Sequence, residues 1–440
     1  MEIDLSKIKN VHFIGIGGIG ISAIARMMLH EGKIVTGQDM QEGEVVHELK
    51  KAGVDIKIGQ SYENIPEGTD LIVYTIAIDT YDVGLAIKIK EQTEIPVKSY
   101  PQMLDIISHD KYTIAVSGTH GKTTTTAMIA QILVDNGNDP TVIVGSLLVG
   151  SKSNFIAGNS KYLVVEACEY RRSFLNINPT ILVITNIDED HLDYYKDIED
   201  IKSAFREMAM KVPADGFVVC NPSDKNISEV IDGIDAKIIN WEEFFKSDLK
   251  LKIPGVHNKK DAAGALAATS VLGISTDIGE KYVYNFAGTW RRFEFKGKLK
   301  SGALVYDDYA HHPTEILATL DGFRELYPKG DGWKVTVIFQ PHLFSRTKLL
   351  LNDFAKSFSD ADQVLILPIY YAREVDDGSI SSLILSDEIN KHSNNSKDFK
   401  DFRSVEEYME NQISNKTNKD IIVTMGAGDA FKIGDYLLKI

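Results

Sequence analysis

The sequence predicts an α/β protein with three domains, each built around a mainly parallel sheet. Short apolar segments alternate with helix-compatible segments in three successive series along the 440 residues, a pattern typical of parallel strands joined by crossover helices. A chain of this length also exceeds what one hydrophobic core usually supports. Polar turns precede the second and third series, so we expect domains at residues 1–109, 110–286 and 287–440.

The expected elements can be given in order along the chain. In the first domain, strands are expected at 11–17, 33–39 and 71–75, and helices at 19–30 and 45–52. In the central domain, strands are expected at 112–116, 162–167, 181–186 and 216–221, with a helix at 125–134. In the last domain, strands are expected at 303–309, 334–340, 363–369 and 421–425, each followed by helix-compatible sequence. The polar stretch 391–401 is expected to be a solvated loop.

Composition narrows the class of protein. The chain has 63 acidic and 48 basic side chains, a net charge of -15, which argues against nonspecific nucleic-acid binding and requires any phosphate site to be local. Its only cysteines, Cys168 and Cys220, are too few for a disulfide framework and favour a reducing compartment. No segment has the length of a membrane span, and the apolar stretch 11–25 lacks a signal-peptide cleavage pattern. We therefore expect a cytoplasmic protein without a membrane partner.

A candidate phosphate loop lies between the expected strand 112–116 and helix 125–134. Residues 117–124 are S-G-T-H-G-K-T-T. Glycines let backbone N–H groups approach phosphate oxygens, and a helix N-terminus adds partial positive charge. Lys122 could reach the terminal phosphates and Thr123 could bind Mg²⁺. The first glycine is Gly118, two positions later than in a strict P-loop, and the alternative is a turn that only caps the helix.

A second glycine pattern opens the first domain. Residues 15–20 are G-I-G-G-I-G, they follow a strand and precede a helix, and Asp39 lies about 20 residues further on, as in dinucleotide-binding folds. The same glycines could hold the diphosphate of a nucleotide sugar, because a helix N-terminus recognises the diphosphate alone. A turn required only for close packing of helix and strand is the remaining alternative.

Acidic and oxygen-bearing side chains follow two strands of the central domain. Glu166 and Glu169 come after the strand 162–165, and residues 185–191 are T-N-I-D-E-D-H. Ligands of open α/β sheets bind at this carboxyl edge. Thr123, Glu166 and His191 could therefore surround one or two magnesium ions. The alternative is a solvated acidic turn in which His191 caps a helix.

The last domain has a comparable polar segment, D-D-Y-A-H-H-P-T-E at 307–315. Its two adjacent histidines lack the i, i+4 spacing that directs two rings at one zinc ion, so a hydrogen-bonded loop is expected. Arg291 and Arg292 precede an alternating strand, and Arg346 follows Q-P-H at 340–342. Arginines at strand ends could bind phosphates or a carboxylate through two parallel hydrogen bonds, although exposed arginines are usually only solvated.

Taken in order, these segments resemble the Mur ligases of peptidoglycan synthesis, and the resemblance covers nearly the whole chain. The matching segments are 15–20, 117–124, 166–169, 185–191, 255–258, 291–294, 307–315, 340–342, 372–374 and 426–429. The resemblance implies a Rossmann-like first domain for the UDP part of the substrate and a P-loop ATPase-like central domain. It also implies a Rossmann-like last domain that closes over ATP and receives the amino acid.

Within the family, the pattern is most similar to members that join L-alanine to the lactyl carboxylate of UDP-N-acetylmuramate. The resemblance implies that ATP, with Mg²⁺, phosphorylates this carboxylate and that the L-alanine amine attacks the acyl phosphate. It implies an enzyme that is a monomer or homodimer. Three alternatives remain: a family member that attaches a preformed tripeptide during wall recycling, an NAD-dependent oxidoreductase, which leaves the Lys122 loop unexplained, and a non-catalytic P-loop switch.

The resemblance also assigns roles to residues. Catalysis is expected from Lys122, Glu166, His191 and Arg292, with Thr123 and Glu166 on one magnesium ion and His191 on another. ATP is expected to contact Gly118, Thr119, His120, Gly121, Lys122, Thr123, Thr124, His257, Asn258, Arg292 and Asp308. Substrates are expected at Gly15, Gly17, Gly18, Gly20, Asp39, His312, His342 and Arg346, the last of these on the alanine carboxylate.

The chain departs from the family pattern at several positions. Asp261 replaces the second asparagine of the segment that begins at His257, and Cys168 stands where many members have aspartate. Leu343 occupies a position that is often basic, which leaves Arg346 as the candidate for the amino acid's carboxylate. The segment 221–254 is also short for the family.

Overall fold

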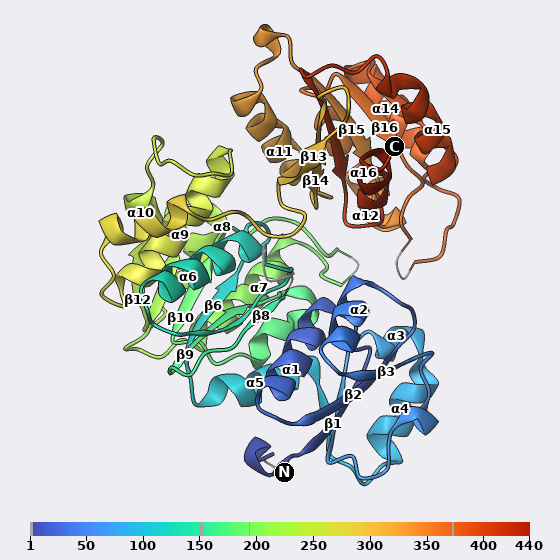
Figure 1. Cartoon of the computed structure of the whole chain (residues 1–440). Helices are drawn as coiled ribbons and strands as arrows, with labels where there is room; N and C mark the ends of the chain where they lie inside the picture. The colour runs from blue at the N-terminus through green and yellow to red at the C-terminus, as the bar shows by residue number, and fades with distance from the viewer. Residues whose placement is uncertain (1–2, 149–152, 193, 372–373) are drawn as a thin grey trace. The chain divides into compact units, whose positions relative to one another are not determined.

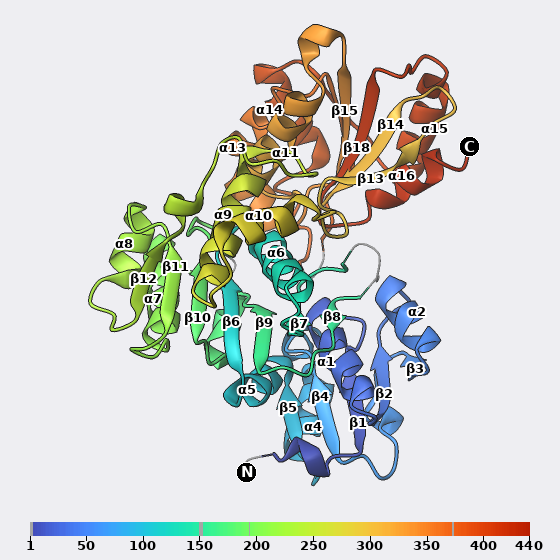
Figure 2. The same ribbon diagram turned by 60° about the vertical axis from the view of Figure 1, so that its left-hand side comes forward.

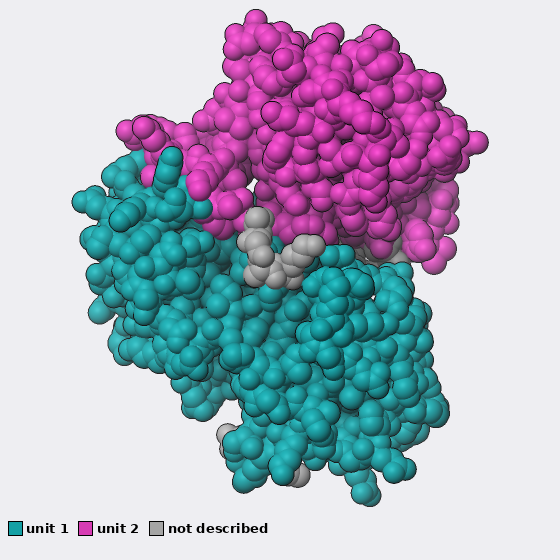
Figure 3. All heavy atoms as spheres, viewed as in Figure 1, with its two compact units in different colours: residues 1–246, 260–285 teal, residues 247–259, 286–440 magenta. Residues whose placement is uncertain are grey.

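The chain forms two compact units. The computed structural model describes residues 3–148, 153–192, 194–371 and 374–440. Residues 1–246 and 260–285 form the first unit, and residues 247–259 and 286–440 form the second (Figure 3). The first unit contains two sheets and the second unit one. The domain boundaries expected at 109/110 and 286/287 stay predictions.

The first sheet is entirely parallel, with strand order β3-β2-β1-β4-β5. Figure 1 labels β1, β2 and β3, and Figure 2 labels all five strands. The strand order changes direction between β1 and β4, and the crevice at such a switch point is where open α/β sheets bind ligands. The glycine segment 15–20 follows β1 at this point. The elements are β1 (Asn10–Ile14), α1 (Ile19–His30), β2 (Ile34–Asp39), α2 (Glu44–Lys51), β3 (Asp55–Ile58), β4 (Leu71–Tyr74), α3 (Ile78–Tyr81), α4 (Val83–Glu91), β5 (Val97–Ser99) and α5 (Tyr100–His109).

Local sequence explains where α5 begins. Ser99 accepts a hydrogen bond from Gln102 N–H, and the Gln102 side chain accepts one from Ser99 N–H. Pro101, in the first turn, lacks the N–H that a helix start leaves unpaired. Helix α5 then ends at His109, directly before the second sheet begins.

The second sheet has the order β12-β11-β10-β6-β9-β7-β8 and is parallel except for the β7–β8 pair. Its central strand β6 runs between β10 and β9, and all residues from Thr113 to Ser117 are buried. The elements are β6 (Tyr112–Ser117), α6 (Lys122–Asp135), β7 (Thr141–Ile143), β8 (Phe155–Ile156), β9 (Tyr162–Glu166), β10 (Ile181–Ile184), α7 (Ile198–Met210), β11 (Phe217–Cys220), α8 (Lys225–Ile231), β12 (Lys237–Asn240), α9 (Val256–Ser270) and α10 (Thr276–Tyr284).

The third sheet has the order β13-β14-β18-β15-β16-β17, and only β13 is antiparallel. Figure 2 shows β14, β18 and β15 as neighbours. Apolar side chains from these strands belong to two buried clusters. The elements are β13 (Glu294–Lys298), β14 (Leu304–Asp308), α11 (Pro313–Leu326), β15 (Lys334–Phe339), α12 (Phe344–Leu349), α13 (Leu351–Lys356), β16 (Gln363–Ile366), α14 (Ser382–His392), β17 (Ser396–Asp398), α15 (Phe402–Ile413), β18 (Asp420–Met425) and α16 (Phe431–Leu437).

The expected loop at 391–401 is wrong in part. Strand β17 lies within it and pairs in parallel with β16. Its residues are Ser, Lys and Asp, so the strand is held by backbone pairing at a sheet edge and has no apolar alternation to reveal it. The short strands β3, β5 and β12, which were not predicted, also lie at or beside edges. Within the described part of the chain, no helix is long and apolar enough to cross a membrane.

Candidate functional site

The phosphate loop lies at the carboxyl edge of the second sheet. It connects the central strand β6 to α6, which begins at Lys122. Gly118 and Gly121 have φ angles of 138° and 81°, a region that L side chains rarely adopt. A Cβ atom would lie 1.9 Å from Thr185 Oγ1 at Gly118 and 2.2 Å from Asp261 Oδ1 at Gly121. Both conformation and space therefore require glycine at these two positions.

The segment after β10 holds the phosphate loop in place. Asn186 binds both polar backbone atoms of His120, accepting from its N–H at 2.9 Å and donating to its carbonyl at 3.0 Å. The Thr185 hydroxyl donates to the same carbonyl at 2.6 Å, and Asp188 N–H donates to Thr119 Oγ1 at 2.8 Å. Residues 185–191 were expected to contribute to metal binding, and this supporting role was not predicted. The parallel pairing of β10 with β6 places residues 185–191 beside the phosphate loop.

Lys122 is held inside this loop. Its Nζ donates to the carbonyls of Gly118 and Thr119 at 2.5 and 2.9 Å and to Glu169 Oε1 at 3.0 Å. Burial opposes the charged form, but the nearby acidic groups, Glu169 foremost, outweigh it and raise the pKa of Lys122 above its ordinary value. The side chain is therefore a fixed cation at the phosphate site.

Two carboxylates at the end of β9 have different partners. Glu166 accepts from the Thr123 hydroxyl at 3.0 Å and from Gly145 N–H at 2.7 Å. The structure thus brings together Thr123 and Glu166, which were both expected to bind magnesium. Glu169, which the sequence analysis did not select, is the carboxylate that contacts Lys122.

His191 lies beside Glu169. Its Nε2 is 3.6 Å from Glu169 Oε1, and its ring lies 4.8 Å from the Tyr170 ring. His191 does not cap the helix that follows, because Asp197 is the N-cap of α7. Its role as a metal ligand stays a prediction.

The donors present suit magnesium. The Thr123 hydroxyl and the Glu166 carboxylate offer adjacent oxygen atoms, and Mg²⁺ is usually bound by one or two carboxylates together with substrate phosphates. Among the described residues, no group of three or more His, Cys, Asp or Glu side chains is gathered as a complete metal site. A site completed by phosphate oxygens is consistent with both observations.

The glycines of the segment 15–20 are explained largely by packing. Gly15 has a φ of 74°, and a Cβ there would lie 2.4 Å from Thr75 Cγ2. At Gly20, a Cβ would lie 2.6 Å from the Tyr100 ring. Gly17 N–H donates to Asp39 Oδ2 at 2.7 Å, so Asp39 ties the loop to the end of β2. The glycine pattern therefore does not decide between a dinucleotide and a nucleotide sugar.

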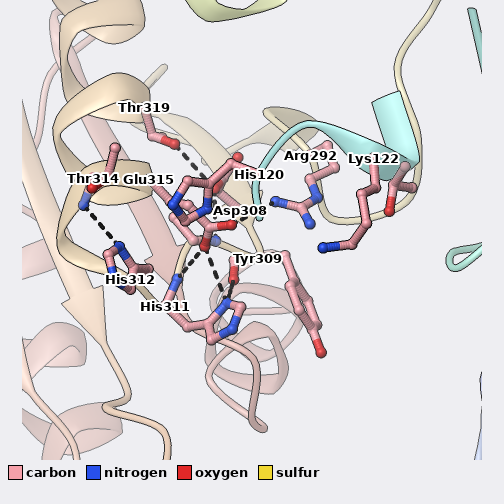
Figure 4. A network of polar contacts seen from close by, with 12 residues as sticks. His120, Lys122, Arg292, Asp308, Tyr309, His311, His312, Thr314, Glu315 and Thr319 are labelled. Atoms are coloured by element: carbon pink, nitrogen blue, oxygen red, sulfur yellow. Dashed lines mark hydrogen bonds and ion pairs between the residues drawn. The ribbon is translucent and has the colours of Figure 1, made fainter. Parts of the chain in front are cut away.

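In the second unit, Asp308 organises the loop after β14 (Figure 4). Its two oxygens accept from Phe293 N–H at 2.7 Å, Ala310 N–H at 2.8 Å and the Thr319 hydroxyl at 3.1 Å. Burial raises the pKa of Asp308, and the Arg292 charge opposes that shift. Arg292, which precedes β13, therefore lies near Asp308 at the end of β14. Their contacts with ATP stay predictions.

The hydrogen-bonded loop expected at 307–315 is confirmed. His312 caps α11 by accepting from Thr314 N–H at 3.3 Å (Figure 4). His311 Nδ1 lies 3.2 Å from Glu315 Oε2 and 3.1 Å from the Tyr309 carbonyl oxygen. The two rings therefore contact different groups.

Arg291 and Arg292, of which only Arg292 was expected to contact ATP, have different surroundings in the structure. Arg291 is 3% exposed and donates to Asp307 at 2.7 Å and to the carbonyls of Gly428 and Gly426 at 2.9 and 2.5 Å. It therefore fastens the segment 426–429 to β14. Arg292 is more exposed, and its guanidinium lies 5.2 Å from the Tyr309 ring centre.

Arg346, which was expected on the alanine carboxylate, lies one turn after His342. Arg346 Nη1 is 3.2 Å from His342 Nδ1, and Arg346 is buried near the start of α12. Leu343 between them has a φ of 72° and is buried, a strained backbone of the kind that gathers at functional sites. At the start of α9, Asn258 donates to the Pro254 carbonyl at 2.5 Å. The adenine contact of His257 and Asn258 stays a prediction.

Three family descriptions match the chain in series. They are the Mur ligase family, catalytic domain, at residues 10–112, the Mur ligase middle domain at 116–244, and the Mur ligase, glutamate ligase domain, at 291–428. The chain belongs to the Mur ligase family. The predicted resemblance is thereby confirmed, and the two glycine-rich loops are explained as features of two successive Mur ligase domains.

Individual Mur ligases match over the full length. A UDP-N-acetylmuramate--L-alanine ligase of Caldanaerobacter subterraneus subsp. tengcongensis is 42% identical, with 100% of this chain and 99% of that protein covered. The protein of that name from Clostridium kluyveri is 40% identical, with both chains fully covered. The crystal structure of UDP-N-acetylmuramate-alanine ligase from Thermotoga maritima has a TM-score of 0.80 at 27% identity, covering 98% of both chains. The predicted three-domain α/β fold of a Mur ligase is confirmed.

The departures from the Mur ligase pattern lie in and around the site. Asp261 lies against Gly121 at the start of α6, so it adds a carboxylate beside the phosphate loop. Cys168 is exposed between the two carboxylates, and Leu343 is buried. The segment 372–374 of the resemblance falls partly outside the described residues.

Proposed function

We propose that this Mur ligase joins L-alanine to the lactyl carboxylate of UDP-N-acetylmuramate in peptidoglycan precursor synthesis, converting ATP to ADP and phosphate. The observation that carries the proposal is full-length identity of 42% and 40% to two UDP-N-acetylmuramate--L-alanine ligases. The contacts of Lys122, Thr123 and Glu166 support it, since they place a cation and oxygen donors at one phosphate loop.

The reaction needs an activated carboxylate. A carboxylate oxygen first attacks the γ-phosphorus of ATP, and the bond to the ADP oxygen breaks. The amine of L-alanine then attacks the carbonyl carbon, so a C–N bond forms, phosphate leaves with its C–O bond electrons, and the nitrogen loses a proton. Phosphoryl transfer of this kind depends mainly on positioning and on stabilising negative charge.

The first unit provides that stabilisation. We assign Lys122 to the transferring phosphoryl group, because its buried cation is held at the loop. Thr123 and Glu166 would hold one magnesium ion, with His191 near a second. When bound, magnesium supplies positive charge to the phosphate oxygens.

The remaining expected roles belong to the proposal. Residues 15–20 and Asp39 would receive the UDP part of the substrate. In the second unit, Arg292, Asp308, His257 and Asn258 would contact ATP. His312 and His342 would contact substrate, and Arg346 would bind the carboxylate of L-alanine. The monomeric or homodimeric state and the cytoplasmic location are part of the same proposal.

One assay tests the function and its nearest alternative. Phosphate release from ATP is measured with UDP-N-acetylmuramate and, in turn, L-alanine, glycine, L-serine or the tripeptide of wall recycling. We expect L-alanine to give the highest kcat/KM. Release that requires the tripeptide would assign the chain to recycling instead. Release that no acceptor stimulates would contradict a ligase.

A further inference from the structure

Glu169 is a buried carboxylate of the phosphate site without a role in the reaction described above. Its side chain is 4% exposed. One oxygen, Oε1, lies 3.0 Å from Lys122 Nζ and 3.6 Å from His191 Nε2. The other oxygen, Oε2, is buried and has no hydrogen-bond partner among the described residues. A carboxylate in this condition is costly to keep, so its place beside two expected catalytic residues calls for an explanation.

The backbone around Glu169 leaves its side chain little freedom. Its carbonyl accepts from the Tyr195 hydroxyl at 2.5 Å and from Arg172 N–H at 2.8 Å. Arg171 and Arg172 have φ angles of 52° and 54°, so the chain turns sharply just after Glu169. Tyr170, the next residue, packs against the His191 ring. The local fold therefore directs one carboxylate at both Lys122 and His191.

We propose that Glu169 is a positioning residue for phosphoryl transfer, and this inference rests on the proposed ligase function. Its carboxylate orients the Lys122 ammonium and the His191 imidazole and balances the lysine charge. Nucleotide phosphates then compete with Glu169 for the same ammonium in the ground state. An interaction accelerates a reaction only if it is stronger in the transition state than in the ground state. Because Glu169 restrains Lys122 in the ground state, the lysine binds the phosphates more strongly only when the transferring group develops charge.

The contrast with Glu166 sharpens the assignment. Glu166 uses its oxygens on the Thr123 hydroxyl and Gly145 N–H, at the expected magnesium position. The Glu169 carboxylate instead faces two nitrogen-bearing side chains, Lys122 and His191. Neutralising the two carboxylates should therefore have different consequences. Loss of the Glu166 charge should raise the half-maximal magnesium concentration. Loss of the Glu169 charge should lower kcat while the affinity for ADP stays equal or increases.

The test uses the full chain with Glu169→Gln, which keeps the shape and removes the charge. We expect kcat to fall about tenfold or more while the Kd for ADP, measured by calorimetry, stays equal or decreases up to about fivefold. The KM for L-alanine should change less than about twofold. Glu229→Gln is the matched control, since Glu229 also pairs with a lysine, Lys202, but on α8 and α7. It should leave kcat and the ADP Kd unchanged.

Three results would overturn the proposal. They are a kcat within about twofold of the wild-type value, an ADP Kd raised about tenfold, or a half-maximal magnesium concentration raised about tenfold, which would make Glu169 a metal ligand. Should Glu169→Gln fail to fold, Glu169→Asp takes its place and must lower kcat at an unchanged ADP Kd. ADP binding needs neither alanine nor the sugar nucleotide, so the comparison remains valid even if the wild-type chain ligates another acceptor.

Discussion

The two glycine-rich loops of the first unit follow parallel strands in the same way but differ in the charges around them. At the phosphate loop, Lys122 is buried between backbone carbonyls and Glu169. At the N-terminal loop, the contact is a carboxylate, since Asp39 accepts from Gly17 N–H. Glycines determine the backbone path in both loops. The charged side chains differ, and for that reason reaction chemistry is expected only at the phosphate loop.

The two loops also differ in what their glycines avoid. Gly118 and Gly121 face polar atoms of Thr185 and Asp261, whereas Gly15 and Gly20 face the side chains of Thr75 and Tyr100. A glycine motif therefore indicates close approach without saying what approaches. The expected roles of the two loops can be separated by the following experiments.

Removing Lys122 should give the largest effect. Lys122→Ala eliminates the cation assigned to the transferring phosphoryl group, and we expect kcat to fall about a thousandfold. It also leaves Glu169 buried without its ammonium, which should cost about 3 kcal/mol of stability. Phosphate release and urea unfolding measure the two effects.

Two further variants check this interpretation. Adding Glu169→Gln to Lys122→Ala should restore most of the lost stability without restoring activity, because no unpaired charge remains. Lys202→Ala, at another ion pair of the same unit, should leave kcat unchanged. If Lys122→Ala alone kept a near-normal rate, the phosphate loop would not be the reaction centre.

Neutralising Glu166 should have the next largest effect. Glu166→Gln removes the charge beside Thr123, so we expect kcat to fall about a hundredfold and the half-maximal magnesium concentration to rise. Asp39→Asn, the corresponding change at the N-terminal loop, should leave the magnesium dependence as it is. Rates measured over a magnesium titration distinguish the two loops. Equal magnesium dependence in the Glu166→Gln and wild-type chains would remove Glu166 from the metal site.

The sequence predicted the phosphate loop well because its strand, glycines and helix are local features. Helix α6 begins at Lys122, and α1 occupies the predicted range 19–30. The role of Glu169 was not predicted, because the contact between its carboxylate and Lys122 depends on the tight turn at Arg171 and Arg172. Strand β17 was missed for a similar reason, since backbone pairing with β16 holds a polar segment at the edge.

Ligand stabilisation tests the N-terminal loop directly. UDP-N-acetylmuramate at about 100 times its Kd should stabilise the native chain by about 2.7 kcal/mol and raise the first unfolding transition by a few degrees without ATP. NAD and NADP should produce no shift. Gly17 and Asp39 are the contacts expected to matter, so Asp39→Ala should weaken the stabilisation. A saturable shift with NAD and none with the sugar nucleotide would assign this loop to a dinucleotide.

The smallest expected effect concerns Arg346, which belongs to the second unit. Arg346 is on α12, and its guanidinium lies beside His342, which precedes that helix. A guanidinium can bind a carboxylate through two parallel N–H bonds. Arg346→Ala should therefore raise the KM for L-alanine about tenfold, which corresponds to about 1.4 kcal/mol for one charge-assisted contact. Arg346→Lys should remain impaired, because lysine offers only a point charge. Initial rates over a range of L-alanine and ATP concentrations separate the two sites. A raised KM for ATP with unchanged alanine dependence would place Arg346 on the phosphates.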